Sequence, residues 1–220
     1  MTRTLKPEMD NRTACYALLA ELYRREPSAE WIETLKRTLT PVETGETELD
    51  AALARFVCAL SSAPARELVE PLAVDYARVF LGAGRIKADA AYPIESVYTS
   101  PGRLVMQEAW EAVLAAYAEA GFERRPDEDL HEDHLALELD FLARLGRRAA
   151  KADAEGDAEA RNRALQTSAD FLKVHPLRWT DAFARDVERY AETDFYKALA
   201  AFTVAFLKAD ARFLQTASRT

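Results

Sequence analysis

Apolar side chains recur along this chain every three or four residues, and polar side chains fill the positions between them. In one run the apolar positions are Leu49, Leu53, Phe56, Val57 and Leu60, which share one face of a helix. The same spacing recurs in the ranges 15–22, 72–80, 110–117, 135–142 and 195–206. The pattern predicts amphipathic helices whose apolar faces pack together, and therefore an all-α helical bundle.

Helix-breaking residues fall between these periodic runs. They are Pro27 with Ser28, Pro41, Pro64, Gly121, Pro126, Gly156 and Pro176. Such residues stop or start helices, so they predict the helix ends. Pro71 lies inside a run instead. Because proline is tolerated in the first turn of a helix, we expect a new helix to begin at Pro71.

One long segment, residues 82–101, has no sustained helical period and contains two glycines and two prolines. It predicts a long non-helical loop. Long loops are uncommon in compact domains and often bind ligands. The apolar and aromatic group within it, residues 93–98, is equally compatible with a buried wedge between helices. Both interpretations stay open at this point.

Composition supports a helical globule. Of 220 residues only 7 are glycine, while 49% are apolar and 30% are charged. The apolar and charged fractions exclude a disordered chain, and the scarcity of glycine argues against a strand-rich fold with many tight turns. The length allows one large domain or two small ones. We expect a single all-helical domain over residues 1–220.

Charge and patterning narrow the location and the partners. The net charge is −8, which argues against nucleic acid as a partner, since neutralising phosphates needs a basic face. The first twenty residues mix acidic and basic side chains without the apolar core of a signal peptide, and no uncharged apolar stretch of membrane-spanning length follows. We therefore expect a cytoplasmic protein that does not insert into membranes. Cys15 and Cys58, at apolar helical positions, are predicted to be buried thiols.

A cluster of titratable residues comprises His131, Glu132, Asp133, His134 and Glu138. The two histidines stand three residues apart, whereas zinc peptidases use a spacing of four. A di-iron bundle needs two Glu-x-x-His pairs, and the three histidines of this chain do not supply the second pair. A helical-bundle metalloenzyme using His131, His134 and Glu138 is kept as the alternative function.

The same region is strongly acidic. Between Glu123 and Asp140, eight acidic residues stand against Arg124 and Arg125, a local net charge of −6. Glu132 and Asp133 fall at the predicted start of a helix, where a carboxylate caps free N–H groups. The acidic side chains form either a solvated helix face or a site for a basic ligand.

Signatures of common catalytic sites are missing from the sequence. It has no phosphate-binding loop, no Gly-x-Ser-x-Gly elbow and no recognisable cysteine nucleophile. We predict no catalytic residues, no metal and no cofactor.

Five short segments, in this order, resemble the TorD/DmsD family of redox-enzyme maturation chaperones. They are Asp75-Tyr76 with Val79-Phe80-Leu81-Gly82, Pro93-Ile94-Glu95-Ser96-Val97-Tyr98, Glu132-Asp133-His134, His175-Pro176-Leu177-Arg178-Trp179, and Thr193-Asp194-Phe195-Tyr196-Lys197-Ala198-Leu199. The resemblance implies a chaperone, not an enzyme. Its expected partners are the twin-arginine leader and the apo form of the catalytic subunit of a molybdopterin oxidoreductase. It would assist cofactor insertion and proofreading before export, as a monomer or a dimer.

The resemblance also implies a leader-binding site in which carboxylates lie beside an apolar groove and pair with the two arginines. The expected residues are Asp75, Tyr76, Phe80, Pro93, Ile94, Glu95, Ser96, Tyr98, Glu132, Asp133, His134 and Trp179.

Overall fold

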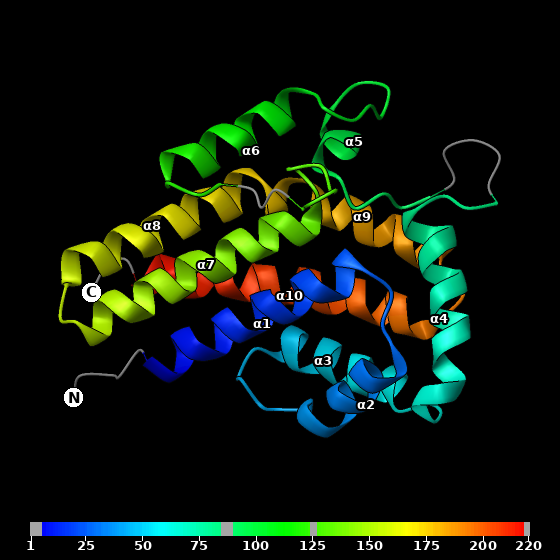
Figure 1. The fold of residues 1–220 in the computed structure, drawn as a ribbon. Helices are drawn as coiled ribbons and strands as arrows, with labels where there is room; N and C mark the ends of the chain where they lie inside the picture. The colour runs from blue at the N-terminus through cyan, green and yellow to red at the C-terminus, as the bar shows by residue number, and fades with distance from the viewer. Residues whose placement is uncertain (1–5, 85–89, 124–126, 218–220) are drawn as a thin grey trace. The chain divides into compact units, whose positions relative to one another are not determined.

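The computed structural model describes residues 6–84, 90–123 and 127–217, and these residues form ten helices and no strand. The helices are α1 (Lys6–Arg24), α2 (Ala29–Thr38), α3 (Thr47–Leu60), α4 (Ala65–Phe80), α5 (Glu95–Thr99), α6 (Glu108–Glu119), α7 (Leu135–Ala154), α8 (Ala158–Val174), α9 (Pro176–Tyr190) and α10 (Asp194–Ala217) (Figure 1). The all-α prediction is confirmed. Within the described ranges, no helix combines the length and the apolar character needed to cross a bilayer.

Several helices end or begin at the helix-breaking residues named from the sequence. The hydroxyl of Ser28 accepts a hydrogen bond from the backbone N–H of Trp31 at 3.2 Å and caps α2. The carboxylate of Asp157 caps α8 in the same way through Ala160 N–H at 2.9 Å. These side chains satisfy N–H groups that the first turn of a helix leaves without a partner. Gly156, with φ +76°, makes the left-handed turn between α7 and α8.

Pro71 does not begin a helix, so that prediction is wrong. Helix α4 starts directly after Pro64 and runs through Pro71 to Phe80. A proline inside a helix leaves the carbonyl four residues earlier without its N–H donor. Both Pro71 and Glu67, which carries that carbonyl, are exposed, so water can supply the missing hydrogen bond. The internal proline is tolerated because it lies on the solvent side of α4.

The predicted non-helical loop, residues 82–101, contains the short helix α5, and this corrects the prediction. Residues 85–89 of the loop lie outside the described residues. The helix escapes detection because its buried positions include Glu95 and Ser96 as well as Val97. Polar residues on the inner face hide the apolar period on which sequence reasoning depends.

The two cysteines also depart from expectation. Cys15 is half-buried and Cys58 is exposed, and both are free thiols. The inner face of α3 carries Leu53, Phe56 and Leu60. Cys58 stands two residues from both Phe56 and Leu60, which turns its side chain to the opposite side of the helix.

The chain divides into two compact units. The first unit comprises residues 1–24, 94–179 and 210–220, and the second comprises residues 25–93 and 180–209. Helices α9 and α10 contribute residues to both. The expectation of a single domain over residues 1–220 stays a prediction.

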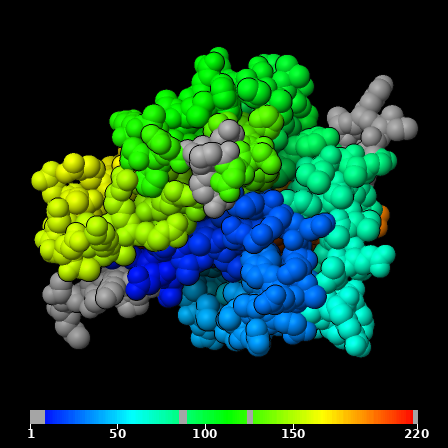
Figure 2. All heavy atoms as spheres, in the orientation of Figure 1, coloured from blue at the N-terminus to red at the C-terminus, as the bar shows by residue number. Residues whose placement is uncertain are grey.

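In the first unit, α7 packs along α1 on one side and along α8 on the other (Figure 1). The approach of α1 requires Gly146 on α7, because a Cβ there would lie 2.3 Å from the hydroxyl of Thr13. Tyr117, Phe141 and Phe171 form an aromatic cluster between α6, α7 and α8, with ring centroids 4.6–5.9 Å apart. In the space-filling view the atoms of α6 lie over those of α7 and α8 (Figure 2).

In the second unit, a separate aromatic core joins α3, α4 and α10. Phe56 packs on Phe195 and Phe202 with ring centroids 5.2 and 5.8 Å apart. Phe80 packs edge-on against Tyr196 at 5.2 Å. Aromatic pairs of this geometry stabilise a fold beyond the area that they bury.

A buried ion pair ties α1 to the end of α10 within the first unit. Nε and Nη2 of Arg12 donate to the two oxygens of Asp210 at 2.6 and 2.9 Å. The hydroxyl of Tyr16 donates to Asp210 Oδ2 at 2.6 Å. Arg12 and Asp210 are only 5% and 4% exposed, so each depends on the other for charge compensation.

We expect Asp210→Ala to lower the free energy of unfolding by about 3–5 kcal/mol, because it leaves the buried Arg12 without a counter-charge. Urea denaturation followed by circular dichroism measures the loss. The double variant Arg12→Met with Asp210→Leu should recover most of it, since a buried ion pair is replaceable by apolar side chains. A single variant as stable as the wild type would contradict this role.

Candidate functional site

The short helix α5 lies against the start of α7. A β-bridge pairs Ile94 with His134, and the backbone N–H of Glu95 donates to the carbonyl of Asp133 at 2.9 Å. The sequence predicted that residues 93–98 and the Glu-Asp-His segment belong to one site. Within the first unit the structure brings Ile94 and the residues after it together with that segment.

Asp133 anchors α5 through its side chain. Its Oδ2 accepts hydrogen bonds from the backbone N–H of Ser96, at 2.9 Å, and from the hydroxyl of Ser96. Asp133 and Ser96 are both 0% exposed. A carboxylate in such surroundings needs hydrogen-bond donors to compensate for lost hydration. The second oxygen, Oδ1, has no hydrogen-bond partner among the described residues.

The cap of α7 is His134, not the predicted Glu132 or Asp133. Nδ1 of His134 accepts from the backbone N–H of Ala136 at 3.1 Å. Burial, together with the nearby charges of Arg24 and His131, lowers the pKa of His134 to about 3. The ring is therefore neutral, as an accepting Nδ1 requires. The sequence placed the cap one or two residues early.

Glu132 is the accessible member of the Glu-Asp-His segment. It is half-buried and accepts a hydrogen bond from the indole N–H of Trp110 on α6. Its backbone carbonyl accepts from the hydroxyl of Tyr117 at 3.1 Å. Trp110 and Tyr117 were not predicted to belong to the site, because aromatic residues at helical spacing usually belong to the hydrophobic core.

A second set of buried groups lies on the other side of α5. Nδ1 of His175 lies 2.8 Å from Glu95 Oε2, and the indole N–H of Trp179 donates to Glu138 Oε2 at 3.3 Å. Glu95 and Glu138 are each 0% exposed, and their carboxyl groups lie close enough to interact directly. Burial, and next the charge of Glu95, raise the pKa of Glu138 well above its ordinary value.

Aromatic contacts complete the surroundings of α5. Tyr98 stacks on Trp179 with ring centroids 5.4 Å apart, and the guanidinium of Arg103 lies 4.8 Å from the Tyr98 ring centroid. The following residues, Leu104 to Met106, are exposed and apolar. The short helix α5 is thus held by the buried polar contacts of Glu95 and Ser96 and by the stacking of Tyr98.

Asp75, predicted for the site, lies in the second unit and has a different environment. Its carboxylate accepts from the backbone N–H groups of Glu192 and Thr193 at 3.1 and 2.7 Å, and from the Thr193 hydroxyl at 2.6 Å. Arg78 forms an ion pair with it. These contacts secure the connection that precedes α10, which gives Asp75 a structural role within its own unit.

Tyr76, Phe80 and Pro93 are also residues of the second unit, and all three are buried. The rings of Tyr76 and Phe80 meet edge to face at 5.2 Å, and Phe80 also stacks on Phe183 at 6.0 Å. These two rings fill the core of that unit.

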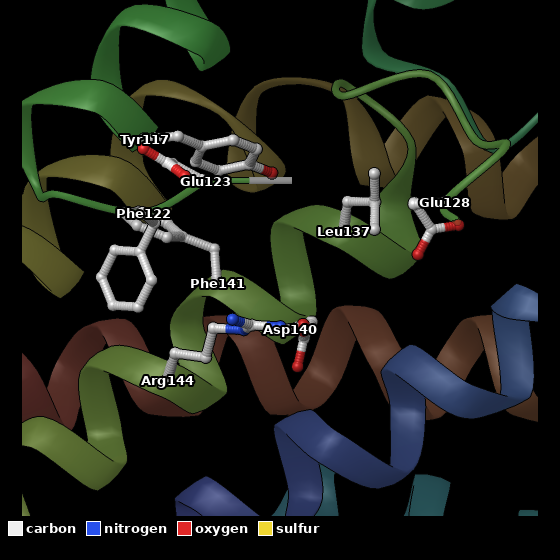
Figure 3. Close-up of a pocket in the computed structure, with 8 residues that line it drawn as sticks. All are labelled: Tyr117, Phe122, Glu123, Glu128, Leu137, Asp140, Phe141 and Arg144. Carbon is white, nitrogen blue, oxygen red and sulfur yellow. Dashed lines mark hydrogen bonds and ion pairs between the residues drawn. The ribbon is translucent and has the colours of Figure 1, made fainter. Parts of the chain in front are cut away.

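Two hollows of the first unit lie beside the acidic segment. The smaller, about 40 Å³, is lined by Tyr117, Phe122, Glu123, Glu128, Leu137, Asp140, Phe141 and Arg144 (Figure 3). Arg144 pairs with Asp140 at 2.9 Å, and Arg24 pairs with Glu128. Glu123, Asp127 and Asp129 are exposed, whereas Arg124 and Arg125 lie outside the described residues. One exposed carboxylate, that of Glu123, thus lines this hollow, and Asp127 and Asp129 follow close by in the chain.

The larger hollow is a groove of about 710 Å³ between α6, α7 and α8. Its apolar lining includes Ala116, Phe141, Leu145, Ala164, Phe171 and Val174, and its polar lining includes Glu119, Arg148, Asp157, Arg163, Asp170 and His175. Sequence reasoning missed this groove, because it depends on how three helices separated in the chain diverge.

The metal alternative finds no geometric support in the described part of the chain, where no group of three histidine, cysteine, aspartate or glutamate side chains is arranged to hold an ion. His134 uses Nδ1 to cap α7, and Glu138 Oε2 accepts from the indole N–H of Trp179.

Comparison with known proteins agrees with the motifs. A family model described as nitrate reductase delta subunit matches residues 40–185, which is more than half of the chain. Chaperone protein TorD of Vibrio cholerae serotype O1 is 30% identical over 217 residues, covering 96% of this chain and 94% of that protein. TorD of Photobacterium profundum is 29% identical over 168 residues (76% and 75%), and TorD of Vibrio parahaemolyticus is 28% identical over 213 (93% and 95%).

The family predicted from the sequence motifs is therefore confirmed, and with it the expectation of a chaperone rather than an enzyme. The chain belongs to the nitrate reductase delta subunit family, which is the family of the TorD chaperones.

Proposed function

We propose that this chain is a cytoplasmic chaperone for the catalytic subunit of a molybdopterin oxidoreductase. It binds the twin-arginine leader and the apo form of that subunit, assists cofactor insertion and delays export until folding is complete. Membership of the family supports the chaperone role. The two hollows of the first unit support the leader-binding step.

One observation carries the proposal: Phe141 lines both the acidic hollow and the apolar groove. A twin-arginine leader has two adjacent guanidinium groups followed by an apolar stretch that can form a helix. Its receptor needs carboxylates next to an apolar channel, and recognition of an amphipathic helix by a groove is a common mode of binding. In the first unit, carboxylates and an apolar groove both lie next to the ring of Phe141.

The groove suits the apolar part of the leader. Its lining includes Leu145, Ala164 and Phe171, whose side chains are buried, and Val174, which is exposed. A volume of about 710 Å³ lies within the usual range of ligand-binding hollows. The charged residues that line it carry both signs, among them Glu119, Arg148 and Asp170.

The acidic segment suits the arginines. Glu123, Asp127 and Asp129 are exposed and Glu132 is partly exposed, so they can form charge-assisted hydrogen bonds without a rearrangement of the core. The segment from Ile94 to Tyr98 contacts the segment from Glu132 to His134, and Tyr98 stacks on Trp179. For all the residues expected at the site, including Asp75, Tyr76, Phe80 and Pro93 of the second unit, contact with the leader stays a prediction.

The first test uses a synthetic twin-arginine leader peptide and a matched peptide with both arginines replaced by alanine. We expect the alanine peptide to bind at least about tenfold more weakly, a loss of about 1.4 kcal/mol. The difference should shrink as salt concentration rises, because exposed carboxylates are screened. Isothermal titration calorimetry measures both affinities. Equal binding of the two peptides would refute the acidic contact.

The second test probes the groove with Val174→Lys. Val174 is 45% exposed, so the change should leave the free energy of unfolding within about 0.5 kcal/mol of the wild type. It places a positive charge on the apolar path of a cationic peptide, and we expect leader affinity to fall about tenfold. Val42→Lys is the matched control, since Val42 is 51% exposed in the second unit and adds the same charge. An equal loss in both variants would exclude the groove.

A further inference from the structure

Glu95 and Glu138 form a carboxyl pair that is closed to water. Each uses one oxygen for a neighbour, Glu95 for His175 and Glu138 for Trp179. The other oxygen of each, Oε1, has no heavy-atom donor among the described residues. Asp133 lies near them, and its Oδ1 also has no hydrogen-bond donor among the described residues. Buried oxygens without donors are costly, so this arrangement needs an explanation.

A shared proton supplies the missing donor. Two ionised carboxylates in contact and without water repel strongly, and such pairs hold one proton between them. An O–H···O bond between Glu138 and Glu95 would satisfy both Oε1 atoms at once. The two carboxyl groups lie close together, since their Oε2 atoms are held by His175 and Trp179, one helical turn apart. Burial and the charge of Glu95 raise the pKa of Glu138, in the direction that keeps this proton in place.

The charges around the pair are mostly negative. The titratable groups that face Glu138 in the described chain are Glu95 on α5, Asp133 before α7 and Tyr117 on α6, while His175 after α8 faces Glu95. Among the described residues, no lysine or arginine pairs with these three carboxyl groups. A shared proton therefore removes one of the three negative charges that these carboxyl groups carry when all are ionised.

The apolar groove reaches this cluster. His175, the partner of Glu95, also lines the groove, and its ring centroid lies 4.6 Å from that of Phe171 on the groove wall. Displacing the His175 side chain would connect the groove with the two glutamates. Helix α5, which carries Glu95, is a single helical turn held by the Asp133 and Trp179 contacts.

We infer that the Glu95–Glu138 pair is a guanidinium site closed by a proton, and that binding of a twin-arginine leader expels this proton. The inference rests on the proposed function. One guanidinium enters at the His175 end of the groove, α5 shifts outward, and the O–H bond of the pair breaks as its proton passes to solvent. The second guanidinium stays with the exposed carboxylates. The complex then holds two carboxylates and one guanidinium where the free protein held one proton.

The free protein provides a test that is independent of any leader. A glutamate whose pKa is raised on folding stabilises the fold fully below its ordinary pKa and loses that contribution as pH rises through the raised value. Glutamine keeps the neutral form and can still accept from Trp179. We expect the urea midpoint of Glu138→Gln, relative to the wild type, to increase between about pH 5 and about pH 8.

Glu159→Gln is the control, because Glu159 is on α8 with a side chain 87% exposed. Its midpoint difference from the wild type should stay constant over the same range. If the Glu138→Gln difference is equally flat, the pair holds no proton and the inference is overturned, whatever the leader does.

The second test counts protons on binding. The heat of binding of the synthetic twin-arginine peptide is measured in two buffers of different ionisation enthalpy, at several pH values between about 5 and about 8. We expect release of up to about one proton per bound peptide, and an affinity that rises with pH wherever release occurs. Release should vanish in Glu138→Gln and persist in Glu159→Gln.

The outcomes separate the two claims. Peptide binding without proton release, or release that persists in Glu138→Gln, overturns the proton-closed site and leaves the proposed chaperone function standing. Proton release on binding of the alanine peptide would show that a guanidinium is not what displaces the proton. That result would also overturn the proton-closed site. Failure of the wild type to bind the twin-arginine peptide refutes the leader-binding function and this inference with it.

Discussion

The bond between Ser96 and the Asp133 carboxylate joins segments 37 residues apart in a place that water does not reach. A carboxylate buried in this way must find donors within the protein, and Asp133 finds them in the backbone and hydroxyl of Ser96. The position of α5 follows from this constraint, because one helical turn is too short to be stable by itself. The contacts of Glu95 and Tyr98 then add to an anchor that the Asp133 side chain has already set.

Most of the fold follows from local sequence. Apolar side chains at helical spacing predicted the runs that became α1, α3, α4, α6, α7 and α10, and Ser28 and Gly156 marked helix ends correctly. Two of the failed predictions, those for Pro71 and for residues 82–101, have a common origin. Pro71 remains inside α4 because water can satisfy the carbonyl of Glu67, and α5 forms although its inner face is polar. Both depend on whether a polar group reaches water or a distant partner, which local periodicity does not encode.

The sequence predicted which residues belong to the candidate site better than it predicted what each of them does. Residue type and proximity in sequence singled out Glu132, Asp133 and His134, but their functions in the structure differ: His134 caps α7, Asp133 anchors α5, and Glu132 remains partly accessible. The pairing of Glu95 with His175 spans 80 residues and has no local signal. The groove between α6, α7 and α8 is likewise invisible in sequence, since it depends on the divergence of packed helices.

The distribution of carboxyl groups bears directly on how a chaperone of this kind can hold and then release a client. Exposed acids near Glu132 attract a cationic segment at long range but bind it weakly, because water and salt screen them. Buried acids bind more strongly, yet a ligand reaches them only if α5 moves, which costs part of the binding energy. Joining the two kinds of site through one groove gives rapid capture at the surface and tighter holding inside. The Glu95–Glu138 proton would set the balance between them, since each ligand charge that enters must replace a charge already there.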